Sequence, residues 1–242
     1  MANLTIMRAR FPNANNGANL ATPDPKETTV LSGTGGYIYL DMGESIAVDT
    51  WFFGFIGPTT TSIGAIYSTD AAWTGVTYVG DILSLGPSTA RRRHAFGKAV
   101  SPTTSRYWRI TYANSAASTL GIVAIGKSIQ PAYGHEWGSR RGVRDMSEVT
   151  PLRGGGFGIE RGARAGGYEF TCGDLTDAEV ESLYDMVQEV GESSPVVVCR
   201  DPALTGADLN AALHYGLLDR PEAYAREAPG RNSWSFRVKD WV

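Results

Sequence analysis

The segment Gly121-Ile-Val-Ala-Ile-Gly-Lys-Ser128 has the residue spacing of a phosphate-binding P-loop. Such a loop must be flexible, because its backbone N–H groups surround an anion between a strand and a helix. Three of the four residues between Gly121 and Gly126 are β-branched and favour an extended backbone, and Pro131 cuts short any following helix. We therefore predict a core strand that ends at Gly126, with no nucleotide bound.

The histidines and cysteines could in principle hold a metal. His94, His135 and His214 are not spaced with each other or with cysteines as metal ligands usually are, and we expect them on surface loops. Cys172 and Cys199 are too few for a disulfide framework or a zinc site. We expect two small core residues in a reducing compartment, with a single cross-strand disulfide left open.

Four carboxylates lie close together in sequence and could act as an acid–base pair: Asp174, Asp177, Glu179 and Glu181. They are more simply explained as favourable charges at the N-terminus of a helix. A Gly-x-Ser-x-Gly nucleophile elbow is absent from the sequence. We therefore predict no catalytic, cofactor-binding or metal-binding residues, and no enzyme activity.

Two further features could bind a ligand. The cluster Arg91-Arg-Arg93 could hold phosphate, lipopolysaccharide or DNA, although a solvated loop or a salt-bridged subunit contact explains it more simply. Trp73 lies in an expected loop, where an aromatic ring could stack on a sugar or anchor a neighbouring subunit.

The composition is that of a folded protein rich in β-structure. The 242-residue chain is 42% hydrophobic and contains 29 glycines, six tryptophans and eleven tyrosines, which favour strands joined by turns. A net charge of −3 argues against specific nucleic-acid binding. No apolar run approaches the ~18 residues of a membrane span, and the first ten residues do not look like a secretory signal, so we expect no membrane insertion.

The first half of the chain alternates apolar runs with turn residues about every ten positions, which is typical of an all-β sandwich. Residues 11–36 are expected to form a loop. The aromatic run Trp51-Phe-Phe53 and Phe55 is assigned to the core. Strands are predicted over residues 36–41, with a turn at Met42-Gly43, and over 45–57, 63–67, 75–79, 106–114 and 120–126.

The second half predicts a sheet with one packed helix. Thr176-Asp-Ala-Glu179 forms a capping box, apolar residues follow at helical spacing, and Gly191 is a natural stop, so a helix is expected over 177–190. Strands are expected over 168–172 and 195–199. A closing strand over 234–238 should bury Trp234, Phe236 and Val238 and expose Ser235 and Arg237.

A change in composition near Gln130 indicates a domain boundary. Residues 131–167 contain six arginines among many glycines, and we expect paired strands with glycine-rich turns or an arm that reaches a neighbouring subunit. The prediction is a mainly β protein with a β-sandwich over 1–130 and a β-sheet domain over 131–242.

Two stretches of the first half resemble a known fold. Tyr37-Ile-Tyr-Leu-Asp-Met-Gly43 followed by Ile46-Ala-Val-Asp-Thr50 resembles the entry of galactose-binding-like (discoidin-type) domains. Arg106-Tyr-Trp-Arg-Ile110 with the strand over 120–126 resembles their exit. The resemblance covers about residues 30–130 and implies a jelly-roll sandwich. These are core motifs, so they do not imply a bound sugar.

The second half resembles another family. The segments 175–183, 194–202 and 234–241 are similar to the C-terminal part of minor tail and baseplate proteins of long-tailed phages, among which distal tail proteins are the nearest in role. In the best-known distal tail proteins the ring-forming domain comes first, whereas here the galactose-binding-like domain does.

The tail-protein resemblance implies a virion protein of the distal tail or baseplate, assembled in the host cytoplasm. Its implied partners are copies of itself in a three-fold or six-fold ring, the tail tube, the tape measure and the baseplate hub. The alternative is a carbohydrate-binding module on the phage tail that contacts host surface glycans.

Overall fold

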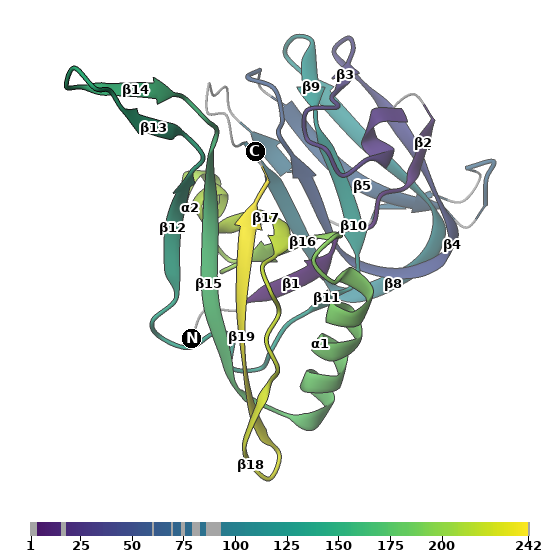
Figure 1. Ribbon diagram of the computed structural model, residues 1–242. Helices are drawn as coiled ribbons and strands as arrows, with labels where there is room; N and C mark the ends of the chain where they lie inside the picture. Colours follow the sequence, from purple (N-terminus) through teal and green to yellow (C-terminus); the bar gives the residue numbers. More distant parts are fainter. Residues whose placement is uncertain are drawn as a thin grey trace.

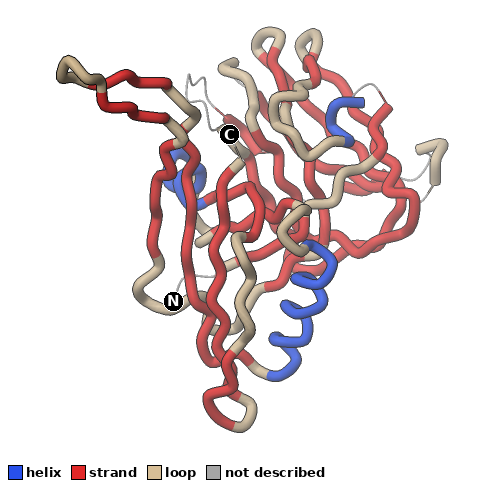
Figure 2. The backbone as a smooth tube through the Cα atoms, viewed as in Figure 1, coloured by secondary structure: helices blue, strands red, loops and turns tan. Residues whose placement is uncertain are grey.

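The structure, a computed structural model, describes residues 4–15, 18–59, 61–68, 70–73, 76–78, 83–85 and 93–241. It is mainly β, with two extended sheets, a long helix at the lower centre of the view and a projecting hairpin at the upper left (Figure 1 and Figure 2). The hairpin is formed by β13 (Glu148–Pro151) and β14 (Phe157–Glu160). The expected fold class is therefore confirmed: a β-sandwich is followed by a second sheet with a packed helix. No described helix is long and apolar enough to cross a membrane.

The first sheet forms the sandwich. Among the described residues its strand order is β10–β4–β8–β5–β6, with β2 paired to β4 and β7 paired to β5. A separate pair, β3 and β9, adds Leu31 and Leu120 to the same core. The strands of this half are β2 (Asn13–Asn15), β3 (Thr29–Leu31), β4 (Gly35–Gly54), β5 (Thr61–Ser68), β6 (Val76–Tyr78), β7 (Leu83–Leu85), β8 (Ala95–Asn114), β9 (Ser118–Leu120) and β10 (Ile122–Gly126).

Strand β4 corrects two sequence predictions. The turn expected at Met42-Gly43 is a bulge within one 20-residue strand, where Gly43 adopts a φ of +78° and its N–H donates to Asp41 Oδ1 at 2.8 Å. A bulge lets the strand bend without ending the ladder. The expected loop over 11–36 likewise contains β2, β3 and the short 3-10 helix η1 (Ala18–Ala21).

The second sheet has the strand order β11–β1–β16–β17–β19–β15–β12 among the described residues, with β18 paired to β19. Trp234, Phe236 and Val238 of β19 are buried, while Ser235 and Arg237 are exposed, as the alternation predicts. The strands are β1 (Thr5–Arg8), β11 (Ser128–Ile129), β12 (Arg140–Asp145), β15 (Arg164–Leu175), β16 (Pro195–Cys199), β17 (Leu213–Leu218), β18 (Ala225–Ala228) and β19 (Arg231–Asp240).

Helix α1 (Asp177–Val190) has the bounds that the sequence predicts. The Thr176 side chain accepts from the Glu179 N–H at 3.3 Å, and Glu179 Oε2 accepts from the Thr176 N–H at 2.8 Å, so the capping box is complete. The helix buries Val180 and Leu183 against the second sheet. A shorter helix, α2 (Gly206–Ala212), was not predicted.

The two sheets share a third core. Outward-facing residues of the first sheet, including Phe52, pack on residues of the second sheet, including Tyr215; these two rings stack at 5.6 Å. In addition, β1 from the N-terminal part of the chain pairs with β16 and β11. The domain boundary at residue 130 stays a prediction. Residues on both sides of it contribute strands to the second sheet.

Candidate functional site

Three aromatic side chains and one arginine meet on the outer face of the first sheet. We call Tyr37, Tyr39, Trp73 and Arg109 the aromatic platform. Successive strand residues point to opposite faces, and the neighbours of Tyr39 on β4 and of Arg109 on β8 are buried in the sandwich core. Tyr39 lies directly opposite Arg109 in the ladder, so the register brings the rings and the guanidinium together.

Trp73 reaches the platform from the segment that follows β5. Its indole lies 5.1 Å from the Tyr39 ring, between centroids, and the backbone N–H of Trp73 donates to the Asp70 carbonyl oxygen at 3.3 Å. Trp73 has a φ of 60°, a conformation that costs a non-glycine residue ~1–3 kcal/mol. Such strain is typical of residues that a binding site holds in place.

Arg109 has aromatic neighbours instead of an anion. Its Cζ lies 4.1 Å from the Tyr37 ring centroid, 5.4 Å from that of Trp73 and 5.9 Å from that of Tyr39. Its Nε is buried and makes no hydrogen bond, and no described carboxylate forms an ion pair with it. Because Nε itself is buried, a ligand would have to use the terminal Nη atoms, and a guanidinium favours carboxylate or phosphate oxygens.

A neighbouring arginine is already satisfied. Arg106 donates to both oxygens of Asp41, from Nε at 2.6 Å and from Nη2 at 2.8 Å. These hydrogen bonds, with a smaller contribution from the Gly43 N–H, hold the pKa of the Asp41 carboxyl below its usual range despite some burial. This pair borders the platform, and among the described residues it leaves Arg109 as the cation of the platform without an ion pair.

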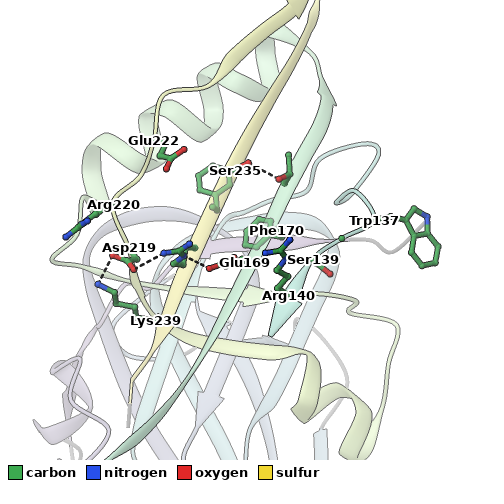
Figure 3. A pocket seen from close by; sticks show the side chains of 14 residues that line it. Trp137, Ser139, Arg140, Glu169, Phe170, Asp219, Arg220, Glu222, Ser235 and Lys239 are labelled. Atoms are coloured by element: carbon green, nitrogen blue, oxygen red, sulfur yellow. Dashed lines mark hydrogen bonds and ion pairs between the residues drawn. The ribbon is translucent and has the colours of Figure 1, made fainter. Parts of the chain in front are cut away.

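The second sheet carries an open cavity of about 610 Å³, and four of the charged side chains that line it form ion pairs with each other (Figure 3). Arg237 Nε lies 2.5 Å from Glu169 Oε1, and Lys239 Nζ lies 2.6 Å from Asp219 Oδ1. The hydrogen bond from Lys239 lowers the pKa of Asp219. Because these four charges satisfy one another, we regard this part of the face as a cross-strand set of ion pairs that stabilises the sheet.

The histidine prediction is wrong for two of the three residues. His94 and His214 are buried, because each ring has a polar partner that offsets the cost of burial. His94 Nδ1 accepts from the Phe55 N–H at 3.2 Å, and His214 Nδ1 lies 2.9 Å from Asp240 Oδ1. His135 is half-buried, and burial lowers its pKa. The described residues hold no group of three or more potential metal ligands of the His, Cys, Asp or Glu type.

The arginine cluster also differs from its prediction. Arg93 is buried instead of solvated, and its guanidinium donates to the carbonyl oxygens of Gly57 and, at 3.0 Å, of Leu85. These backbone acceptors make burial of the charge possible, although burial lowers the pKa of Arg93. Arg91 and Arg92 lie outside the described residues.

The remaining sequence candidates have structural roles. The P-loop-like segment is the fully buried strand β10, which ends at Gly126 as predicted, and a second strand follows it where a P-loop would need a helix. Trp51, Phe52 and Phe53 are core residues, and Phe55 is half-buried.

The cysteines and the clustered carboxylates are also explained by the fold. Cys172 and Cys199 are buried free thiols, so the disulfide left open by the sequence is not formed. Glu179 belongs to the capping box, and Asp177 Oδ1 accepts from Asn232 Nδ2 at 3.0 Å. Asp174 lies 3.6 Å from an Arg231 nitrogen, so these groups are engaged at the helix N-terminus.

Several solved structures that are similar to part of this chain are carbohydrate-binding modules. The carbohydrate-binding module of AlyQ, of family 32 and in complex with 4,5-unsaturated mannuronic acid, is 24% identical over 49% of this chain and 97% of its own length, with a TM-score of 0.39. A pectin-binding module is 17% identical over 50% of this chain and 92% of its own, with the same TM-score.

A further family 32 module, from a Clostridium perfringens protein, is 15% identical over 46% of this chain and 85% of its own length, with a TM-score of 0.37. The similarity covers about half of the chain, and at such TM-scores it says nothing about what this chain binds. No protein family matches the sequence, and no curated protein does.

The sequence pointed to Trp73 but missed its partners. Tyr37 and Tyr39 stand two positions apart on β4, which places them on one face of a strand. Arg109 has the same parity on its strand as Tyr107. This two-residue spacing of large side chains could have indicated that each strand carries a surface-facing row. Only the register between β4 and β8, however, brings the row on β4 next to Arg109 on β8.

Proposed function

We propose that this chain binds glycans through the aromatic platform, with a preference for saccharides that carry a carboxylate. The observation that carries the proposal is Arg109, a guanidinium surrounded by aromatic rings and without a carboxylate partner among the described residues. Of the two roles that the sequence suggested for Trp73, this arrangement favours stacking on a sugar over anchoring a neighbouring subunit.

The chemistry of the platform suits a charged sugar. Aromatic rings provide an apolar surface for the C–H face of a pyranose, and Tyr37 is nearly half exposed. Arg109 supplies charge-assisted hydrogen bonds, which are shorter and about twice as strong as neutral ones. A uronic acid offers both features, since its carboxylate can face the guanidinium while its ring lies on an aromatic side chain.

A glycan array with the full chain tests this proposal. We expect saturable binding to saccharides that contain uronic acids, with much weaker signals from neutral ones. Trp73→Ala and Arg109→Gln should each reduce the binding about tenfold or more, because each removes one of the two recognition elements.

Two matched variants control for general effects of these substitutions. Trp137→Ala removes a fully exposed indole at the cavity of the second sheet, and Arg226→Gln removes an exposed arginine on β18. Both should bind as the unmodified chain does. Equal binding of acidic and neutral sugars, or unchanged binding by the Trp73 and Arg109 variants, would refute the proposal.

We further propose that the chain is a structural subunit of a phage tail, in the distal tail or baseplate. A specific observation favours an assembly role: the projecting hairpin exposes large apolar side chains that nothing within the described chain covers. Copies of the chain in a three-fold or six-fold ring, the tail tube, the tape measure and the hub are the proposed partners. The platform would then contact glycans of the host surface.

Electron microscopy of phage particles with antibody against this chain tests the location. Label at the distal end of the tail supports the proposal, and purified particles that lack the chain contradict it.

A further inference from the structure

A projecting arm extends the edge of the second sheet. We define the arm as residues 140–164, which comprise the edge strand β12 and the hairpin of β13 (Glu148–Pro151) and β14 (Phe157–Glu160). Figure 1 shows the hairpin pointing away from both sheets. An isolated two-stranded hairpin is at best marginally stable in water. We therefore expect a partner to stabilise the hairpin of the arm.

The base of the arm is fixed by specific contacts. Met146 N–H donates to Ala163 O at 3.0 Å, and Gly162 N–H donates to Ser147 Oγ at 3.0 Å. The Asp145 carboxylate accepts hydrogen bonds from Ser147 and, at 2.9 Å, from Arg164 Nε. These hydrogen bonds lower the pKa of Asp145 to about 2. A hydrogen-bonded base of this kind presents the hairpin in a defined direction.

Apolar side chains are exposed along the arm. Phe157 is 67% exposed and Ile159 is 64% exposed, although both belong to the hairpin strands. Exposed apolar groups that are contiguous in this way mark interaction surfaces. The exposed apolar residues of the arm are Val143, Met146, Val149, Leu152, Phe157 and Ile159.

The arm is basic. It holds six arginines against three acidic residues, and only Arg164 among these arginines forms an ion pair in the described chain. The exposed, unpaired arginines are Arg140, Arg141, Arg144, Arg153 and Arg161. A partner for this surface should therefore be acidic and should offer some apolar area.

Helix α1 has the complementary character. It carries five acidic residues and no lysine or arginine. On its exposed face, Glu181 and Asp185 form no ion pair with a described residue, and Tyr184 is 42% exposed between them. Beside the helix lies a groove of about 730 Å³ that Asp185 and Glu189 line together with Arg8, Arg10 and Lys127. Glu189 pairs with Arg8, so the acidic surface that α1 offers to a partner consists of Glu181 and Asp185.

In Figure 1 and Figure 2 the hairpin of the arm points to the upper left, whereas α1 lies below the centre, beyond β15 and β19, so the hairpin points away from the helix of its own chain. We propose that the arm of one copy lies along the exposed face of α1 of the next copy. This contact is head-to-tail, because two different surfaces meet, and such contacts close into rings when the rotation between copies allows it. The proposal rests on the assembly role above and names its two surfaces.

Charge reversal on the full chain tests the contact. An arm variant carries Arg153→Glu and Arg161→Glu, and a helix variant carries Glu181→Arg and Asp185→Arg. In sedimentation velocity we expect the unmodified chain to form oligomers whose association weakens with salt. Each variant alone should associate about tenfold more weakly or worse, because like charges then meet at every contact.

Mixing the two variants gives the decisive result. The reversed arm fits the reversed helix, and the natural arm of the helix variant fits the natural helix of the arm variant. The mixture should therefore form alternating oligomers that neither variant forms alone. Arg226→Glu with Glu227→Arg on the exposed strand β18 controls for charge reversal outside the contact and should leave assembly unchanged.

The outcomes separate this inference from the assembly role. If the arm variant loses assembly while the helix variant keeps it and the mixture gains nothing, the arm binds elsewhere, and the inference fails while the assembly role stands. If neither variant alters the oligomers, the inference also fails. An unmodified chain that stays monomeric at every concentration overturns both. Far-UV circular dichroism checks that each variant is folded.

Discussion

At the scale of single residues, three arginines of the sandwich show how the environment decides a role. Arg93 is buried and donates to backbone carbonyls, and Arg106 is paired with Asp41. Arg109, three residues further along β8, is surrounded by rings and lacks an anion among the described residues. The sequence shows three similar side chains, and only their contacts distinguish Arg109, the residue for which we propose ligand binding.

The two cysteines give a residue-scale prediction. Burial raises the pKa of Cys172 and of Cys199 to about 12, so both remain protonated thiols in the folded protein at neutral pH. We expect a thiol reagent such as 5,5′-dithiobis(2-nitrobenzoate) to label neither at pH 8 in buffer and both in 6 M guanidinium.

The same pKa shift predicts a stability change with pH. The unfolded thiols ionise near pH 9, whereas the folded ones do not, so unfolding is favoured as the pH rises from about 9 towards 12. Urea titrations at pH 8 and pH 10 measure the difference in the free energy of unfolding.

For the labelling experiment, rapid reaction in buffer at pH 8 would contradict the burial of these thiols.

At the scale of elements, local signals predicted what local interactions decide. The capping box, the apolar spacing and Gly191 gave the bounds of α1, and alternation gave the buried face of β19. The pairing of β1 with β16 was missed, because these strands are almost 190 residues apart and nothing local encodes their register. The platform was half predicted for the same reason: Trp73 stood out, but its partners come from two other strands.

The capping box gives an element-scale prediction. Thr176→Ala removes the oxygen that accepts from the Glu179 N–H, and it should lower the free energy of unfolding by ~1 kcal/mol. Urea denaturation measures this change. Ser182→Ala is the matched control, because its hydroxyl bonds to the Ala178 carbonyl within the helix and caps nothing. Equal stability of Thr176→Ala and the unmodified chain would show that the cap does not stabilise α1.

At the scale of the whole molecule, the two sheets are joined by a shared core. Phe52 stacks on Tyr215 across the sheets, and β1 connects the start of the chain to the second sheet. A rigid connection of this kind would hold the platform in a fixed orientation relative to the arm. A ring built through the arms would then present every platform in the same direction.

The shared core predicts cooperative unfolding. Because neither half can separate without exposing this core, calorimetry of the full chain should show one transition whose calorimetric and van't Hoff enthalpies agree. Two resolved transitions would mean that the halves on either side of residue 130 unfold independently.

The most direct test of the account is isothermal titration calorimetry of the full chain with tetragalacturonic acid and with its fully methyl-esterified form. The two ligands share their sugar rings and differ in charge. We predict saturable binding of the acid, at least about tenfold weaker binding of the ester, and loss of this difference in Arg109→Gln. Equal affinity for both ligands in the unmodified chain, or binding of neither, would contradict the central claim that Arg109 and its surrounding rings recognise a carboxylated glycan.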